Sequence, residues 1–233
     1  MREALVAAAA CVAMISTASA AVFTGPTAYK SFDDSPFASL TFSYFYLEDF
    51  EDGAFNTQGA RPSDGWATTI PSGFVDSVDA DDGAIDGSGS GGTSYFSQFA
   101  QDTLTIFFDS EAPGGLPTHA GLVWTDVNGA APNTVIFSAI GADGSDLGSI
   151  GPTEVGDNAI RGETDEDRFF GVSDLGGILS ITIFMPNRNN WEIDHVQYGV
   201  AAANGATPIP VPAALPLFLA GLGGLLFARR GHR

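Results

Sequence analysis

The chain has 233 residues, of which 28 are acidic and nine are Lys or Arg, so its formal net charge is −19. This balance excludes nucleic-acid binding, because phosphate contacts depend on clustered Lys and Arg side chains. The only cysteine, Cys11, excludes a disulfide framework and a thiolate metal site. The acidity itself fits either a surface kept soluble by charge or carboxylates that bind cations.

The N-terminal segment has the pattern of a secretory signal peptide. Arg2 supplies the positive charge, residues 4–15 form an apolar run, and Ala18 and Ala20 give the small-x-small pattern that signal peptidase reads. A run of about 12 residues is too short for a spanning helix, which needs about 20. We therefore expect residues 1–20 to be removed by signal peptidase before Ala21 and the body to be exported.

Between the two ends, the apolar runs are short, rich in β-branched and aromatic residues, and separated by Gly, Asp, Asn and Pro. This pattern is typical of strands and turns. We expect seven strands, at residues 40–47, 103–108, 121–127, 134–140, 168–172, 178–185 and 191–200.

Alternation in residues 178–185 places Leu179, Ile181, Ile183 and Met185 on one wholly apolar face, which should line a core. The 29 glycines disfavour a helical protein. The sequence therefore predicts one all-β domain, an antiparallel β-sandwich of jelly-roll type, over residues 21–203. Residues 204–210 are a linker rich in small residues, and residues 211–233 are a tail with a single transmembrane helix.

The densest acidic stretch is a glycine-rich segment at residues 76–92. Asp-x-Asp spacing lets alternate carboxylates converge on one Ca²⁺ ion, whereas a solvated turn would use the same Asp and Gly residues for their backbone angles. The likeness to an EF-hand is partial, since Gly83 and Ser90 stand where acidic ligands are needed. The candidate ligands are Asp76, Asp79, Asp81, Asp82 and Asp86.

A second acidic group, at residues 46–53, looks like the opening strand of many jelly-roll binding domains. In those domains an acid near the start meets one near the end to hold a structural ion. This likeness implies a Ca²⁺ site at Glu51 and Asp194. A third acidic stretch, residues 162–168, is interpreted as a charged loop before a strand.

No catalytic motif stands out, and we expect the protein not to be an enzyme. Asp194 and His195 are sequence neighbours, so on a regular strand they would point to opposite faces. Paired carboxylates for glycoside hydrolysis remain an alternative, because the sequence does not define their separation. Trp124 and Trp191 lie in apolar strands and should pack in the core, while Trp66 is the tryptophan best placed to stack on a sugar.

The C-terminus combines an apolar run with a basic end. Residues 211–228 carry no charge and are just long enough to span a membrane. Arg229, Arg230 and Arg233 follow, and the positive-inside rule holds them in the cytoplasm. Together with the signal peptide, this tail predicts that residues 21–203 lie outside the cytoplasm and that the C-terminal helix anchors them in the membrane.

This ending resembles the PEP-CTERM class of bacterial sorting signals, and in particular its VPLPA-CTERM variant. The motif residues are Ile209, Pro210, Val211, Pro212 and Ala213. The resemblance covers about 26 residues and implies that a membrane-embedded exosortase-type transpeptidase recognises the tail and cuts near the motif. A plain C-terminal anchor that is never processed is the alternative.

The body is also similar, more loosely, to uncharacterised exported bacterial proteins with such tails, and no activity comes with that likeness. The leading hypothesis is an exported cell-surface or extracellular-matrix protein that interacts with extracellular polysaccharide. A Ca²⁺-dependent carbohydrate-binding module is the alternative, and a glycoside hydrolase is the third.

Overall fold

The computed structural model describes residues 20–68, 77–78, 92–96, 101–112, 114–127, 133–156, 166–186 and 191–202. Their contacts assign the body to a unit that ends at Ala201, and Ala202–Arg233 to a second unit. In the described part of the chain, every regular element is a strand except the one-turn 3-10 helix η1 (Phe32–Asp34).

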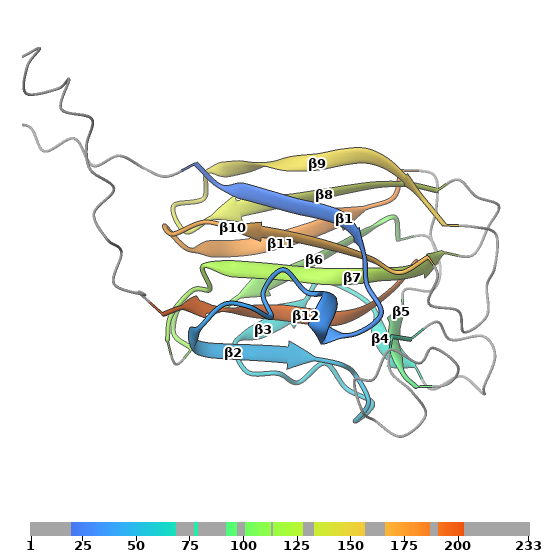
Figure 1. Cartoon of the computed structure of the whole chain (residues 1–233), viewed down its shortest axis with the longest axis horizontal. Coiled ribbons are helices and arrows are strands. Elements are labelled where there is room, and N and C mark those ends of the chain that lie inside the picture. The colour runs from blue at the N-terminus through green and yellow to red at the C-terminus, as the bar shows by residue number, and fades with distance from the viewer. Residues whose placement is uncertain are drawn as a thin grey trace, which may run out of the picture. The chain divides into compact units, whose positions relative to one another are not determined.

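The body is made of two antiparallel sheets (Figure 1). Sheet A runs in the order β1 (Val22–Ala28), β10 (Arg168–Ser173), β7 (His119–Val127), β12 (Trp191–Ala201), β5 (Ser94–Phe96) and β4 (Trp66–Thr68), and β2 (Phe42–Glu48) also pairs with β12. Sheet B runs β3 (Ala60–Pro62), β6 (Thr103–Phe108), β11 (Ile178–Phe184), β8 (Asn133–Gly141) and β9 (Asp146–Val155). The expected all-β antiparallel sandwich is confirmed.

All seven expected strands are present, and none of their ends is shifted by more than two residues. The expectations missed β1, β3, β4, β5 and β9. Four of these, β1, β3, β4 and β9, stand at the ends of the two strand orders, and β1 and β9 each contain a Gly-Pro pair that interrupts the apolar pattern. Proline has no N–H to donate, so it is tolerated at a sheet edge and discourages pairing with another chain.

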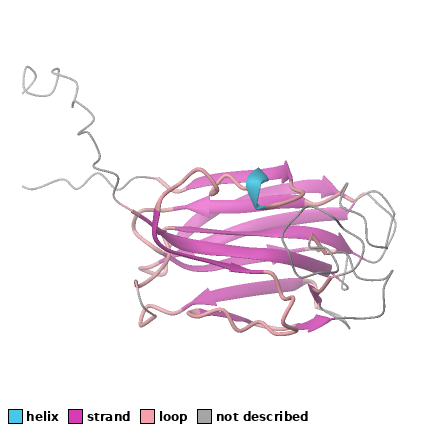
Figure 2. Ribbon diagram, turned by 60° about the horizontal axis from the view of Figure 1, so that its bottom comes forward, coloured by secondary structure: helices cyan, strands magenta, loops and turns pink. Residues whose placement is uncertain are grey.

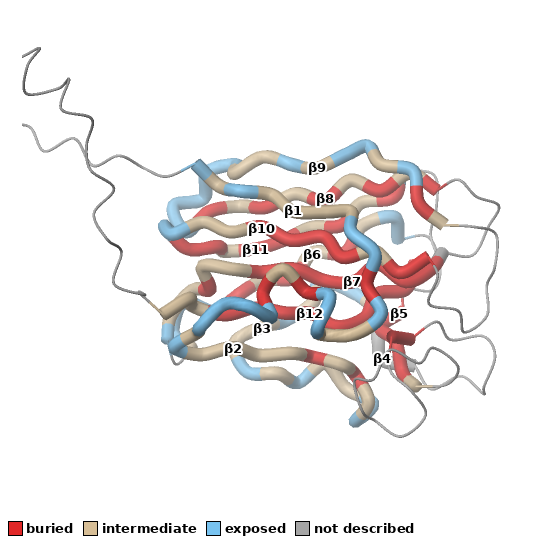
Figure 3. The backbone as a smooth tube through the Cα atoms, in the orientation of Figure 1, coloured by how far each residue is buried: buried red, intermediate tan, exposed pale blue. Residues whose placement is uncertain are grey.

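The core lies between the sheets and is built by alternation. On β8 every second residue from Asn133 to Gly141 is buried, with Val135 and Phe137 in the apolar cluster. Figure 3 shows that buried residues also predominate along β7, β10 and β12. Trp124 and Trp191 are fully buried, which confirms their expected place in the core.

The expected apolar face of residues 178–185 is correct in three of its four residues. Ile181, Ile183 and Met185 are buried, but Ile178 replaces Leu179. The cause is a register shift in the pairing with β8 between Ile178 and Ser180, because an extra residue reverses the side-chain alternation.

The outer face of sheet A is covered as well. A second cluster of buried residues, Tyr29, Phe37, Val78, Val123 and Phe169, packs there with Phe42 and Phe45 beside it. The segment after β1, which contains η1, crosses this face (Figure 2). The central strands of sheet A, β10, β7 and β12, are therefore buried on both faces, and polar groups on their outer face are removed from water.

No helix in the described ranges is long and apolar enough to cross a membrane. The predicted spanning tail, residues 211–233, lies outside these ranges, as does most of the predicted signal peptide. The described body begins at Ala20, and β1 starts one residue after Ala21.

Gly121 tests the packing of the outer face. A methyl group at this position would meet the Phe169 ring at 2.6 Å and the Phe170 carbonyl oxygen at 2.7 Å. We expect Gly121→Ala to lower the free energy of unfolding by about 1–3 kcal/mol, because the ring and backbone must move. Urea unfolding measures the change.

Gly176→Ala is the matched control, because the added methyl group meets only the Asp174 side chain within 4 Å. It should change stability by less than about 0.5 kcal/mol. Equal losses in the two variants would contradict the packing argument.

Candidate functional site

Five carboxylate side chains are buried around one end of sheet A, although most acids of such a chain would be expected in water. They come from β7, from the residues just before β10, and from β12. Their exposed fractions lie between 0 % and 7 %. These residues are Asp126, Glu166, Asp167, Glu192 and Asp194.

A bulge in β12 shapes this site. Asp194 pairs with Val123 of β7, but Gly121 pairs with Gln197, so the strand contains one extra residue between these pairs. His195 lies in the bulge with φ of 41°. Asp194 contacts Ser77 and Val78, and His195 contacts Tyr29, all on the outer face. The expectation that Asp194 and His195 point to opposite faces is therefore wrong, because it assumed a regular strand.

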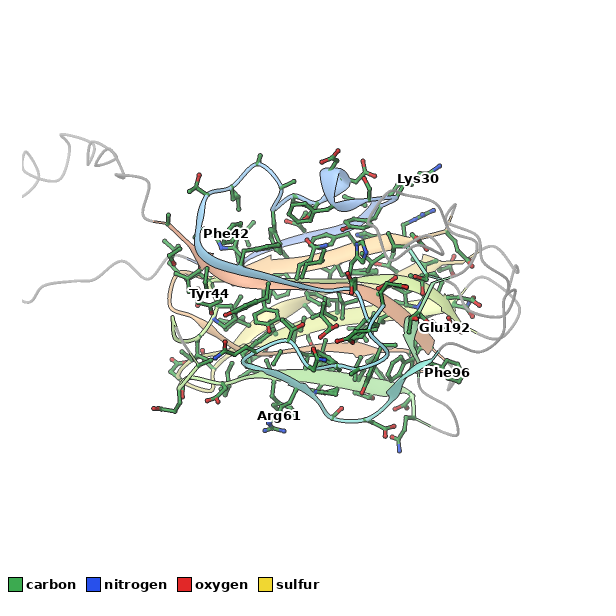
Figure 4. The ribbon with its side chains drawn as sticks, turned by 90° about the horizontal axis from the view of Figure 1, so that it is seen from below. Lys30, Phe42, Tyr44, Arg61, Phe96 and Glu192 are labelled. Atoms are coloured by element: carbon green, nitrogen blue, oxygen red, sulfur yellow. The ribbon has the colours of Figure 1, made fainter. Side chains whose placement is uncertain are left out.

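A second bulge lies on β7. Ile193 pairs with Trp124 and Glu192 pairs with Asp126, so Thr125 is the extra residue. Asp126 and Glu192 consequently stand directly opposite each other, an arrangement in which like charges repel. Glu192 accepts a hydrogen bond from the Ser94 hydroxyl at 2.8 Å. Figure 4 shows Glu192 and Lys30 toward the same end of the sandwich.

Asp194 anchors a short covering segment. Its Oδ2 accepts hydrogen bonds from the Ser77 hydroxyl at 2.9 Å and the Val78 amide at 2.8 Å, and its Oδ1 accepts one from the His195 amide at 2.7 Å. Three donors on one carboxylate favour its charged form. Asp194, a predicted Ca²⁺ ligand, thus lies inside the buried acidic group.

Asp167 has a different environment. It is fully buried, and neither of its carboxylate oxygens has a hydrogen-bond partner among the described residues. Burial raises the pKa of Asp167 well above its usual value, and the charges of Asp194, Glu166 and Asp126 raise it further, whereas Arg168 lowers it. We call Asp126, Glu166, Asp167 and Asp194 the Asp167 cluster. The sequence predicted a charged loop before a strand here, and Glu166 and Asp167 do lie outside any strand directly before β10, but both side chains are buried.

A polar network beside this cluster ties the covering segment to β12. The Tyr29 hydroxyl lies 2.8 Å from Nδ1 of His195 and accepts a hydrogen bond from the Gln197 amide at 2.9 Å. Ser35 donates to Oε1 of Gln197 at 2.6 Å. The contact with the Tyr29 hydroxyl holds the His195 ring in place, and it connects β12 to the segment that covers the outer face of sheet A.

The acids of residues 46–53 organise their own loop. Glu48 is buried and accepts hydrogen bonds from the amides of Phe50, Asn56 and Thr57. Glu51 accepts a hydrogen bond from the Thr93 amide. Glu51 and Asp194 thus hold different segments, and a shared ion site between them stays a prediction.

The remaining predicted site residues are described in part or not at all. Asp76, Asp79, Asp81, Asp82 and Asp86 lie outside the described residues, as do the motif residues 209–213 and the arginines of the tail. The Trp66 backbone belongs to β4, and its side chain is not described. Within the described ranges, no three Asp, Glu, His or Cys side chains already form a ligand group for a metal ion.

Surface hollows also lie elsewhere on the body, and two of them are relevant here. One, of about 340 Å³, is lined by Ser31, Phe32, Asp33, Phe45 and Leu47, with the two phenylalanine rings 5.4 Å apart. The other, of about 470 Å³, includes Ala20, Ala21, Asp143, Asp146 and Asp174 in its lining. The first combines aromatic rings with a polar rim, and the second is acidic.

Comparison with known proteins adds one finding. No protein-family model and no curated protein sequence matches the chain. A solved structure, the CBM22-1 xylan-binding domain from Paenibacillus barcinonensis Xyn10C, is similar with a TM-score of 0.38 and 13 % identity. The match covers 70 % of this chain and 100 % of that domain. A likeness this weak carries no argument about function.

Tyr29 tests the polar network. Tyr29→Phe keeps the ring and removes the hydroxyl that joins His195 and Gln197. We expect the free energy of unfolding to fall by about 1–3 kcal/mol, because buried polar atoms lose a partner. Chemical denaturation monitored by tryptophan fluorescence measures it.

Tyr46→Phe is the control, since its hydroxyl makes an exposed 3.3 Å hydrogen bond to Gln58. Its effect should be below about 0.5 kcal/mol. A Tyr29→Phe protein as stable as Tyr46→Phe would show that the network is not stabilising.

Proposed function

We propose that the protein is an exported, non-catalytic β-sandwich of the cell surface or extracellular matrix, delivered by its C-terminal sorting tail. The observation that carries this proposal is the division of the chain at Ala201, the last residue of β12. Every described strand of the two sheets lies before Ala202. The apolar and basic tail is the part that a membrane-embedded processing enzyme would recognise.

The proposed route has two steps. The signal peptide directs export and is removed before Ala21, one residue ahead of β1. The tail then holds the body at the membrane through residues 211–228, with its arginines on the cytoplasmic side. An exosortase-type transpeptidase cuts near residues 209–213 and releases the body to the envelope or the outside.

The environment of the acids supports a non-catalytic role. A glycosidase needs a general acid whose pKa is raised, beside a second carboxylate at a surface groove. In the acidic hollow, Asp143 is fully exposed, and its hydrogen bonds from Ser145 lower its pKa. Asp146 accepts a hydrogen bond from the Gly148 amide at 2.8 Å. These acids shape turns, and their environment is unlike that of a general acid.

The sorting motif is tested by replacing its prolines. In a host that carries an exosortase, a Pro210→Ala, Pro212→Ala double variant should keep its tail, because the recognised motif is altered. The wild type should lose it. Intact-mass spectrometry of the exported body reads the outcome.

Pro216→Ala is the matched control, because Pro216 lies in the apolar run outside the motif. It should be processed like the wild type. A wild-type protein that keeps residues 214–233 in this host would identify the tail as a permanent anchor and contradict the proposed processing.

Contact with extracellular polysaccharide is the second candidate function. The hollow between Phe32 and Phe45 favours it, since aromatic faces beside polar groups suit sugar rings. Phe32→Ala should weaken retardation in polysaccharide-containing gels several-fold. Phe107→Ala, whose ring instead packs under Arg61 at 4.4 Å, should not. Equal retardation of both variants and the wild type would remove this candidate.

A further inference from the structure

The beginning and the end of the body lie at the same end of sheet A. Val22, the first residue of β1, pairs with Ser173 of β10. Ser173 pairs with His119 of β7, which pairs in turn with Gly199 near the end of β12. Figure 1 shows the start of β1 and the end of β12 at the same side of the body. The two predicted membrane-directed segments of the chain are therefore joined to one end of the sandwich, which we call the exit end.

The exit end carries exposed apolar side chains. Among the described residues, the exposed large hydrophobic side chains are those of Val22, Leu40 and Leu175, with exposed fractions of 59 %, 39 % and 73 %. Leu175 lies in the turn between β10 and β11, and it lines a small hollow together with Val22. Leu40 lies just before Phe42, which pairs with Ala201 of β12. All three side chains are thus at the exit end.

The position of these side chains favours a membrane as their partner. Single exposed apolar residues are common on soluble proteins, but a group of them on one surface marks a contact with a protein or a membrane. Only residues 202–210 separate Ala201 from the apolar run of the tail. Fully extended, this linker spans at most about 30 Å. The exit end therefore stays close to the bilayer as long as the tail is anchored.

We propose that the exit end docks onto the surface of the lipid bilayer in which the tail is anchored, with Val22, Leu40 and Leu175 entering the headgroup region. This inference rests on the membrane anchor of the proposed function. Three aliphatic side chains bury too little area to hold a free protein on a membrane, but the anchored tail makes the contact intramolecular and raises its effective concentration. Removal of the tail accordingly releases the body.

Acids around the apolar side chains determine which lipid surface suits the exit end. Asp174 directly precedes Leu175, and Asp143, Asp146 and Asp174 line one hollow there. Asp143 is exposed, and its hydrogen bonds with Ser145 lower its pKa, so it stays charged. Anionic headgroups repel such carboxylates, and salt screens the repulsion. Docking is therefore stronger on zwitterionic lipid than on anionic lipid.

Fluorescence quenching by lipids with brominated acyl chains tests the docking on the full chain, reconstituted through its tail into phosphatidylcholine vesicles. One fluorophore is attached at Gly176→Cys, beside Leu175, where an added side chain meets only the Asp174 side chain within 4 Å. The matched control carries it at Gln101→Cys, an exposed position before β6 at the opposite end of sheet B. Both proteins use a Cys11→Ser background, because Cys11 is the only native cysteine.

The label at residue 176 should be quenched several-fold more strongly than the label at residue 101. A Val22→Ser, Leu175→Ser double variant should lose this excess, because the apolar contact is removed at positions where polar residues are tolerated. Phosphatidylglycerol in the vesicles should reduce the excess, and added salt should restore part of it.

Two outcomes would overturn the docking alone. Equal quenching of the two labels, in protein that floats with the vesicles, would leave a second copy or another protein as the partner of the exit end. Excess quenching at residue 176 that survives in the double variant would mean that the apolar side chains do not make the contact. Protein that does not float with the vesicles would contradict the membrane anchor of the proposed function, and the docking with it.

Discussion

The burial of carboxylates on a sheet that is covered on both faces is the constraint on which the rest of this structure depends. Asp194 and Asp167 lie beneath the segment that carries η1 and the Ser77–Val78 contact, and both are fully buried. Asp194 is compensated by three hydrogen bonds. Neither carboxylate oxygen of Asp167 has a hydrogen-bond partner among the described residues, and burial raises the pKa of this group well above its usual value.

Two bulges make this arrangement possible. A regular β12 would send His195 to the face opposite Asp194, and a regular β7 would not place Asp126 opposite Glu192. The β12 bulge also brings His195 to Tyr29, so the covering segment is fastened beside the acids. Fold and site are consequently coupled, because the same extra residues that direct the acids also hold the cover in place.

The sequence predicted the central strands better than the edges or the site. Residues 103–108 and 178–184 alternate cleanly and pack as expected, whereas β1 and β9 contain Gly-Pro pairs that conceal the pattern. Asp194 was predicted as an ion ligand, whereas the burial of Asp126 and Asp167 beside it was not predicted. They are far apart in the chain and meet only through the pairing of β10 and β12 with β7. Acids at the ends of three apolar runs were the available signal, and strand order was needed to use it.

The most direct test of this account is the pKa of the Asp167 carboxyl group, measured by carbon-13 NMR over a pH titration. The account predicts a pKa well above the usual value for aspartate, because burial and the charges of Asp194, Glu166 and Asp126 all raise it. A pKa at or below the usual value would contradict the account.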